Sequence, residues 1–372
     1  MTKEGSATHV NPKRPMAPER PIALRDAFSE SRGPVVKEPE SPSIRRDVTA
    51  SARRGRGILG RIPQKGVVAS AIAILLLPRV FGEGILPSMI LAGILGIAAV
   101  GLGLLAGRAG LVSLGQAGLA AVGGYGAAYA AVRWDWPAEA ALLFGMLAGL
   151  VTAWLTSPIC RLRGFYLATA TLTFAVIVQR LLVALTSVTG GANGFPGIPT
   201  LTLFGLEFSS EFRFYVLVWG IALTGVALNA NMLHARFGRA LDTIHADEAT
   251  AAAAGINVGR HKSAAWIISG GYAALGGGLY AYYNLFLSPD QFPISMSIEL
   301  IAGVVVGGAS APLGPLVGVV ALVVVPRHLD LGRGVTTMLA PALLVVFACF
   351  FPRGIVPHVR DLSERLVSKA GR

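Results

Sequence analysis

The sequence contains few charged side chains. Asp, Glu, Lys and Arg make up 14% of the 372 residues, whereas soluble domains carry about 25%. Apolar residues make up 53% of the chain, and the mean hydropathy is +0.61. Because a soluble fold needs more polar surface than this, we predict an all-α protein built from membrane-spanning helices.

Cysteine is almost absent, and so are the familiar motifs of nucleotide and metal sites. Cys160 and Cys349 lie at or in apolar segments and neither belongs to a CxxC pair, so we expect no disulfide. The chain contains no GxxxxGK(S/T) motif for nucleotide phosphates, no HExxH and no Cys/His cluster with metal-ligand spacing. We therefore expect no metal, no cofactor and no enzymatic activity.

Basic residues gather near the amino terminus. Residues 1–65 hold 14 of the 32 Lys and Arg residues and 7 of the 20 Asp and Glu residues, which gives this segment +7 of the net charge of +12. The segment is rich in Pro, Arg, Ser and Glu and has no apolar periodicity, which is typical of a disordered tail. It contains no apolar run, so we expect no cleavable signal peptide. Its basic end resembles a cytoplasmic flank, which favours lipid over nucleic acid as a partner.

Ten apolar segments follow the tail. Their approximate spans are 66–82, 85–107, 110–132, 138–160, 165–187, 213–233, 263–287, 295–309, 312–326 and 335–351. Most of them reach the roughly 20 residues that a spanning helix needs, but 295–309 and 312–326 do not. We predict an inner-membrane helical bundle over residues 66–351, with about 8–10 membrane segments that include short or re-entrant helices, and a cytoplasmic tail over 352–372.

The positions of Lys and Arg indicate how the short pair is arranged. If the amino terminus is cytoplasmic and the chain crosses ten times, most basic residues lie on the cytoplasmic side. One straight helix over 295–326 would leave nine crossings and would place the basic residues from Arg353 onward outside. We therefore predict that 295–326 folds back on itself near its Pro and Gly residues, and that both termini are cytoplasmic.

The longest predicted cytoplasmic loop, 235–262, has the pattern of two helices. Leu241 and Ile244 lie three residues apart, as on one helical face. Asp247 and Glu248 precede an alanine run and suit the first turn of a helix, because carboxylates are favoured there. A glycine follows the run, at the usual helix-ending position. We predict a helix, an acidic turn, a short alanine-rich helix and a glycine stop.

A glycine-rich stretch, 110–126, contains the first candidates for a substrate pathway. Ser113 and Gln116 lie three residues apart, so a helix that starts near Ser113 would present free N–H groups and polar side chains at membrane depth. Many transporters bind anionic substrate groups at such helix starts. Close helix packing through small residues is the alternative explanation.

A second candidate pathway is a polar stripe in the segment 165–187. Tyr166, Thr169 and Thr173 fall at i, i+3 and i+7 on one helical face, and Gln179 lies close to extending that face. The stripe is either the lining of a pathway or a set of threonines that bond to their own backbone.

Two further residues are candidates in the outer half of the protein. Asn193 lies in a run of glycines that signals a turn, and the turn is also a candidate for receiving substrate. Glu299 is an acid inside an apolar segment, where ionisable groups are functional candidates, although near an interface it can also cap or snorkel.

Five motifs occur in an order that resembles one known family. In chain order they are Gly110–Gly118, Arg163–Ala168, Gly190–Gly194, the loop residues Arg239–Leu241 with Asp247–Glu248, Ala254–Asn257 and Lys262, and Val306–Gly308 with Leu313–Pro315. Together they resemble the LivM-type permeases, the membrane subunits of bacterial ABC importers for branched-chain amino acids. The resemblance covers about residues 85–350. Gln116 stands where this family usually has His, and the related urea permeases share most of the motifs.

This resemblance implies partners and a mechanism. The chain would pair with a second related permease, with two cytoplasmic ATPase subunits and with a periplasmic solute-binding protein. The cytoplasmic loop would be the coupling helix, seated in a cleft of an ATPase. The coupling residues would then be Arg239, Leu241, Ile244, Asp247, Glu248, Ala254 and Gly255. The solute would be small and polar, with branched-chain amino acids favoured and urea or an amide as the alternative.

An ion-coupled secondary transporter explains broken helices equally well. It would need an embedded acid, and Glu299 is the candidate. A membrane enzyme is disfavoured, because the sequence contains no constellation of nucleophile or metal ligands.

Overall fold

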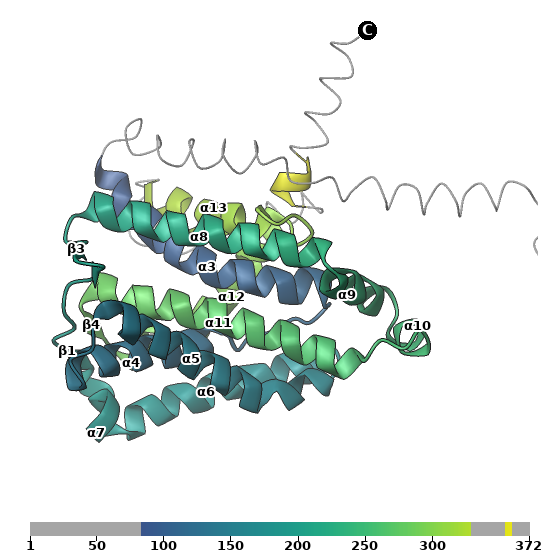
Figure 1. Ribbon diagram of the computed structural model, residues 1–372, viewed down its shortest axis with the longest axis horizontal. Helices are drawn as coiled ribbons and strands as arrows, with labels where there is room; N and C mark the ends of the chain where they lie inside the picture. The colour runs from purple at the N-terminus through teal and green to yellow at the C-terminus, as the bar shows by residue number, and fades with distance from the viewer. Residues whose placement is uncertain (1–82, 329–353, 359–372) are drawn as a thin grey trace, which may run out of the picture. The chain divides into compact units, whose positions relative to one another are not determined.

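The computed structural model describes residues 83–328 and 354–358, and within them the chain is mostly helical (Figure 1). All of them belong to one compact unit, 61–372. The elements are η1 (Glu83–Ile85), α3 (Leu86–Arg108), α4 (Gln116–Arg133), α5 (Ala138–Thr156), η2 (Ser157–Arg161), α6 (Phe165–Ala184), α7 (Thr186–Thr189), η3 (Gly191–Asn193), β1 (Phe195–Pro196), β2 (Thr202–Leu203), β3 (Leu206–Glu207), α8 (Glu211–His234), α9 (Arg236–Ala246), α10 (Glu248–Ala253), α11 (Val258–Asn284), β4 (Phe286–Leu287), η4 (Pro289–Gln291), α12 (Ile294–Gly307) and α13 (Gly314–His328).

Each apolar segment predicted between 85 and 326 corresponds to one long helix. Among the described residues, five helical segments are long and apolar enough to cross a membrane: α3, α5 with the following η2, α6, α8, and α12 with the preceding η4. The prediction of a helical membrane bundle is therefore confirmed. The segments predicted at 66–82 and 335–351, the tail 1–65 and most of 352–372 lie outside the described residues.

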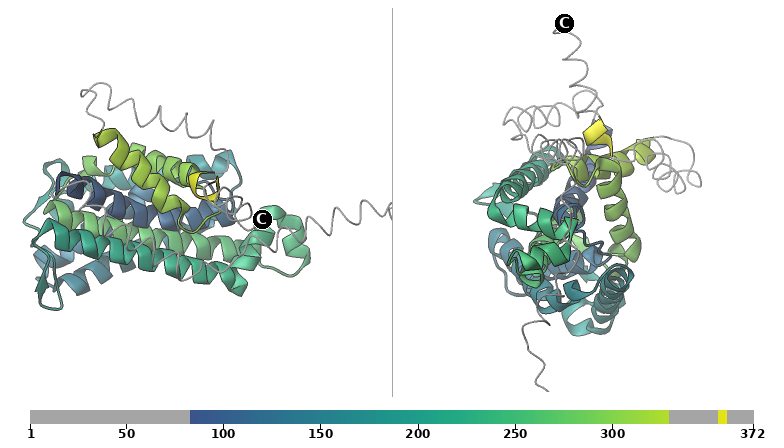
Figure 2. Two further views of the ribbon diagram at one scale, coloured as in Figure 1. Left: turned by 90° about the horizontal axis from the view of Figure 1, so that it is seen from above. Right: turned by 90° about the vertical axis from the view of Figure 1, so that its right-hand side faces the viewer.

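Helices α3 and α11 occupy the centre of the bundle (Figure 2). In α3, 89% of the most apolar stretch is buried, and α11 packs against α3, α4 and α5. Helices α4 and α11 are rich in Gly and Ala, so their backbones approach closely. A Cβ atom on Gly123 would lie 2.2 Å from the carbonyl oxygen of Ala274. Close packing through small residues is thus a real property of the glycine-rich stretch.

Helices α12 and α13 form a hairpin, which confirms that residues 295–326 fold back. The helices pack directly on each other, and there is no space for side chains at two crossing points. A Cβ on Gly307 would lie 1.7 Å from the carbonyl oxygen of Gly314, and one on Gly318 would lie 1.9 Å from that of Gly303. The chain reverses between Gly307 and Gly314 because this glycine- and proline-rich sequence does not continue a helix.

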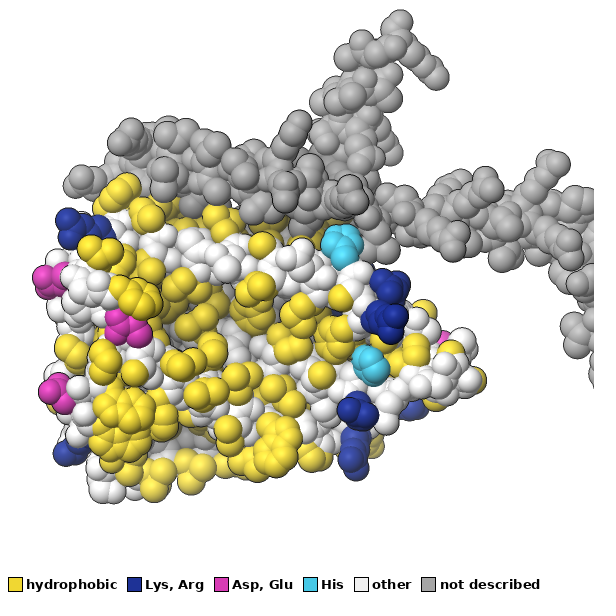
Figure 3. Space-filling model, in the orientation of Figure 1, with side chains coloured by type: hydrophobic (Ala, Val, Ile, Leu, Met, Phe, Trp, Pro, Cys, Tyr) yellow, Lys and Arg dark blue, Asp and Glu magenta, His cyan; other side chains and the backbone are white. Residues whose placement is uncertain are grey.

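The two ends of the bundle differ in charge (Figure 3). The end at which α9 and α10 lie, called the basic end here, carries Arg108, Arg161, Arg163, Arg236, Arg239, Arg260 and Lys262 with Asp242, Asp247 and Glu248. The opposite, acidic end carries Asp135, Glu139, Glu207, Glu211 and Asp290 with Arg133, Arg213 and Arg327. Two short antiparallel pairs, β1 with β4 and β2 with β3, lie at the acidic end (Figure 1).

Candidate functional site

The loop between α8 and α11 folds as predicted. Helix α9 ends at Ala246, and the next residue, Asp247, is the N-cap of α10. The carboxylate of Asp247 accepts hydrogen bonds from the backbone N–H groups of Ala249 at 3.2 Å and Thr250 at 2.9 Å. The hydroxyl of Thr250, together with these two N–H groups, lowers the pKa of Asp247. After α10, Gly255 has a φ of +80° and stops the helix. The predicted helix, acidic turn, short helix and glycine stop are confirmed.

The predicted coupling residues differ in exposure. Leu241 and Ile244 are buried, at 0% and 2% exposure, so they attach α9 to the bundle rather than face another protein. The exposed members of the set are Arg239, Asp247, Ala254 and Gly255. Helix α10 lies at the tip of the basic end, beyond the neighbouring helix ends (Figure 1). The surface open to a partner is therefore formed by α10 and by the outward side of α9.

Arg108, at the end of α3, connects α9 with the turn of the α12–α13 hairpin. Its Nη1 donates a hydrogen bond to Oδ1 of Asp242 in α9 at 3.0 Å. Its Nη2 donates to the backbone carbonyl of Ser310 in the turn, also at 3.0 Å. Sequence reasoning did not identify Arg108 or Asp242 as a pair, because they lie 134 residues apart and no local pattern links them.

Glu248, the first residue of α10, connects α10 with two other segments. One carboxylate oxygen accepts a hydrogen bond from Nη2 of Arg163 at 2.8 Å, and the other accepts one from Nζ of Lys262. The Lys262 side chain is only 5% exposed, whereas that of Arg163 is 77% exposed. The bond from Lys262 is the main cause that lowers the pKa of Glu248. Glu248 thus fastens α10 to the start of α11 and to the segment before α6.

Five polar side chains meet at the start of α4, inside the bundle. This polar cluster consists of Ser113, Gln116, Thr171 of α6, Ser269 of α11 and Ser297 of α12, each with 0% exposure. Gln116 Nε2 donates to Ser269 Oγ at 2.9 Å. The hydroxyl oxygens of Ser297 and Thr171 accept hydrogen bonds from the backbone N–H groups of Ala117 and Leu114. Backbone donors that a helix start leaves unpaired are therefore satisfied by neighbouring helices.

The polar cluster is closed, and one acceptor in it is unused. Gln116 Oε1 is buried and has no hydrogen-bond partner among the described residues. The predicted helix start near Ser113 is present, since α4 begins at Gln116. Sequence reasoning missed the three members from other helices, because an isolated Ser or Thr in an apolar segment gives no signal of its neighbours.

The predicted polar stripe of α6 lies on an exposed face. Tyr166 is 74% exposed, Thr169 and Thr173 are exposed, and Gln179 is half-buried. The Thr169 hydroxyl donates to the carbonyl of Phe165 at 3.0 Å, and the Thr173 hydroxyl donates to that of Thr169 at 2.9 Å. The threonines therefore bond to their own backbone, which is one of the two alternatives predicted from the sequence. The helix face on which they lie is not covered by other described residues.

The remaining two candidates also lie on the surface. Asn193 is exposed in the turn η3, between two glycines with positive φ. Glu299 is exposed on the side of α12. The candidate pathway residues thus occupy two kinds of environment, the closed polar cluster and the open surface.

Comparisons with known proteins agree on one family. A family model described as branched-chain amino acid transport system / permease component matches residues 84–349. The high-affinity branched-chain amino acid transport system permease protein LivM of Escherichia coli (strain K12) is 31% identical over 292 residues, which cover 71% of this chain and 68% of that protein. The protein of the same name from Salmonella typhimurium (strain LT2) is 32% identical over 291 residues, with the same coverage. No solved structure gives a significant match.

Proposed function

This chain belongs to the family of branched-chain amino acid transport permeases, and from that membership we propose that it is the membrane subunit of an ABC importer. As a permease component it is a multi-pass membrane protein rather than an enzyme. We assign to it the import of a small polar solute, driven by ATP that separate subunits hydrolyse. Branched-chain amino acids are the favoured solute, because both relatives are named for them; urea or an amide is the alternative.

The basic end of the bundle faces the cytoplasm in this proposal. Short cytoplasmic loops carry an excess of Lys and Arg, and the described loops at this end do so. The acidic end then faces the periplasm, where its two short β pairs and the turn with Asn193 would meet the solute-binding protein. If the segments 66–82 and 335–351 both span, the two termini are cytoplasmic.

Helices α9 and α10 are the proposed docking element for an ATPase subunit. Their support is structural: α10 lies at the tip of the basic end, its residues apart from Ala251 are at least partly exposed, and it carries Asp247 and Glu248 at its start. This exposed helical element at the basic end is the observation that carries the proposal. A chain that has no phosphate-binding motif of its own needs such a contact in order to use ATP.

Two sets of ion pairs, one at Glu248 and one at Asp242, would transmit a movement of α9 and α10 to the bundle. A displacement of α10 acts through Glu248 on Lys262 of α11 and on Arg163 beside α6. A displacement of α9 acts through Asp242 and Arg108 on the hairpin turn. The two sets of ion pairs contact different segments, so docking would affect α11 and the start of α6 as well as the α12–α13 hairpin.

The exposed face of α6 is the proposed contact with the second permease. Tyr166, Thr169 and Thr173 lie uncovered on this face, and because the two threonine hydroxyls already bond to their own backbone, a second permease can cover them without leaving them unpaired. A second permease that packs against it would enclose a route between the two chains, with Gln179 at its edge. Ser113 and Gln116 would contribute from the polar cluster if the bundle opens during transport.

The first test is the isolation of the complex from native membranes. We expect the tagged chain to copurify with two ATPase subunits and a second permease, and we expect uptake of branched-chain amino acids to need ATP. Transport by the purified chain alone in liposomes, driven by an ion gradient, would instead favour the secondary transporter, with Glu299 as its ion site.

The second test addresses the docking element. Glu248→Lys places a third cation beside Arg163 and Lys262, and Asp247→Lys removes the cap of α10. Each variant should lose ATP-dependent uptake while it stays in the membrane at the level of the parent protein. Glu207→Lys, at the acidic end, is the matched charge reversal for the ATPase contact: the ATPase subunits should copurify with it as with the parent, whereas they should be lost from the two docking variants. Full uptake in both docking variants would refute the assignment of α9 and α10.

A further inference from the structure

A groove at the basic end, between η2 and the start of α11, contains two arginines. Its volume is about 390 Å³, and the residues that line it include Trp154, Ser157, Arg161, Asn257, Arg260 and Ile267. Arg161 and Arg260 are exposed, and neither guanidinium has an acidic partner among the described residues. We call this space the head groove.

The described acids of the basic end cannot neutralise these arginines, because each is already engaged. Asp242 pairs with Arg108, Asp247 caps α10, and Glu248 binds Arg163 and Lys262. The lining of the head groove contains no carboxylate. Two guanidiniums beside Ser157 and Ser263 hydroxyls suit a phosphate, which accepts several charge-assisted hydrogen bonds. Within the part of the chain that the structure describes, no carboxylate is free to complete this groove, which leaves room for an anion from another molecule.

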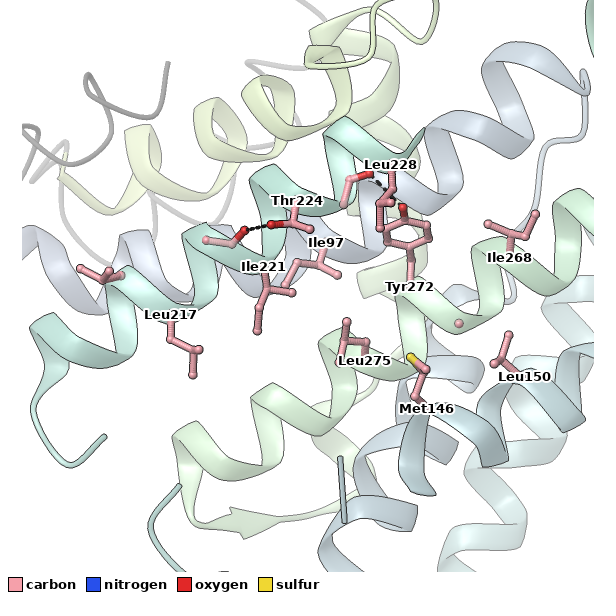
Figure 4. A pocket seen from close by; sticks show the side chains of 14 residues that line it. Ile97, Met146, Leu150, Leu217, Ile221, Thr224, Leu228, Ile268, Tyr272 and Leu275 are labelled. Carbon is pink, nitrogen blue, oxygen red and sulfur yellow. Dashed lines mark hydrogen bonds between the residues drawn. The ribbon is translucent and has the colours of Figure 1, made fainter. Parts of the chain in front are cut away.

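A second hollow lies further along the same pair of helices (Figure 4). This apolar groove has a volume of about 630 Å³, and Met146 and Leu150 of α5, Leu228 of α8, and Ile268 and Leu275 of α11 are among the residues that line it. The two hydroxyls in its lining are already used: Thr224 donates to the carbonyl of Gly220, and Tyr272 donates to that of Gly225. Its occupant must therefore be apolar.

The two grooves are neighbours along α5 and α11. Leu150 of the apolar groove and Trp154 of the head groove are four residues apart on α5, which is about 6 Å along the helix. Ala264 and Ile268 stand in the same relation on α11. A single ligand with a negative head and an apolar chain would fill both spaces.

We propose that the two grooves together bind an anionic phospholipid. The phosphate lies between Arg161 and Arg260, and an acyl chain enters the apolar groove. The neighbouring surface of α5 is apolar and exposed, at Leu147 (47%), Val151 (54%) and Leu155 (64%), as expected of a face in contact with lipid. The ring of Trp154, 63% exposed at the end of this face, lies where aromatic rings meet headgroups. This site needs only a membrane around the chain and does not depend on the transported solute.

Native mass spectrometry of the purified full chain, titrated with lipid in mild detergent, tests the proposal. The probes are phosphatidylglycerol and phosphatidylcholine with identical acyl chains. We expect tighter binding of phosphatidylglycerol. Arg161→Gln with Arg260→Gln should weaken it about 30-fold, or about fivefold per arginine, and should leave phosphatidylcholine unchanged. Arg236→Gln, an exposed arginine of the same end outside the groove, is the matched control and should bind like the parent.

A second variant separates the chain contact from the head contact. Gly220 lines the apolar groove, and a Cβ there would meet no atom within 4 Å, so the side chain of Gly220→Phe can enter the groove without a clash at its base. This variant should weaken both long-chain lipids and leave the binding of dihexanoyl phosphatidylglycerol intact. Size-exclusion elution identical to that of the parent shows that each variant is folded.

Three results would overturn the proposal. One is equal affinity of the parent for the two headgroups. Another is unchanged phosphatidylglycerol binding after both arginines are replaced. The third concerns the complete transporter. If cross-linkers placed at 161 and 260 react with an ATPase subunit there, and phosphatidylglycerol no longer binds to the assembled complex, the head groove is a contact with the ATPase and not a lipid site.

Discussion

Replacing Glu248 with Gln should detach α10 from the bundle. The Lys262 ammonium is 5% exposed and would lose its carboxylate partner while it stays buried. A hydrogen bond to a charged group contributes about 1.5–3 kcal/mol, and the exposed pair with Arg163 contributes about 0–1 kcal/mol. We therefore expect the opening free energy of α10 to fall by about 1.5–4 kcal/mol.

Hydrogen exchange of the amides from 248 to 256 measures this opening. A fall of about 1.5–4 kcal/mol corresponds to a loss of protection on the order of 10- to 1,000-fold, limited by the protection that α10 has in the parent. Glu207→Gln, an exposed carboxylate at the acidic end, is the control and should leave these amides unchanged.

A double-mutant cycle identifies the buried charge as the cause. In the pair Glu248→Gln with Lys262→Met no charge is buried, so the double variant should be closer to the parent than Glu248→Gln alone. Exchange in α10 that is unaffected by Glu248→Gln would refute the reasoning. So would a double variant that is less protected than either single variant.

Other variants test the Arg108–Asp242 ion pair, the α12–α13 hairpin, the pH response of α10 and the exposed face of α6. Arg108→Gln should reduce uptake without changing the abundance of the chain, since it separates α9 from the hairpin turn; a transport assay with immunoblotting measures both. Gly318→Ala should lower thermal stability in detergent by about 1–3 kcal/mol, because its methyl group has no space, whereas Gly220→Ala, inside α8 with open space for its methyl group, should not lower it. The folded pKa of Glu248 is lowered, so its stabilisation of α10 is complete above the ordinary glutamate pKa of about 4.3 and is lost as the pH falls through the folded value; exchange protection of α10 should fall more steeply with pH in the parent than in Glu248→Gln, where the cap Asp247 still titrates. Thr173→Cys should cross-link to the second permease, and cross-linking only to lipid probes would contradict the proposed contact.

Features that depend on neighbouring residues in the sequence could be predicted. The length of apolar runs located every long helix between 85 and 326, and the glycine- and proline-rich break between 307 and 314 located the hairpin turn. Asp247 was predictable as a helix start because a cap bonds to N–H groups only two or three residues away.

Features that depend on packing could not be predicted. The Arg108–Asp242 pair and the polar cluster join residues from distant helices, and an isolated Thr171 or Ser269 looks like any other small polar residue. Periodicity placed Thr169 and Thr173 on one face of α6 but could not say whether that face is covered. Leu241 and Ile244 are a similar case. Their three-residue spacing predicts a shared helix face but does not show whether that face packs against the bundle or against another protein.

The composition of the central helices bears on how the chain enters the membrane. Among the described helices, α4 and α11 are absent from those apolar enough to span by length and composition, yet both are largely buried and pack on each other. Helix α4 is made directly between the strongly apolar α3 and α5, and it packs on α5. The chief neighbours of α11, which are α3, α4 and α5, are all made before it. The order of synthesis therefore provides a protein surface for α11 when it is made, whereas α4 gains its first large protein contact only when the following helix α5 is made.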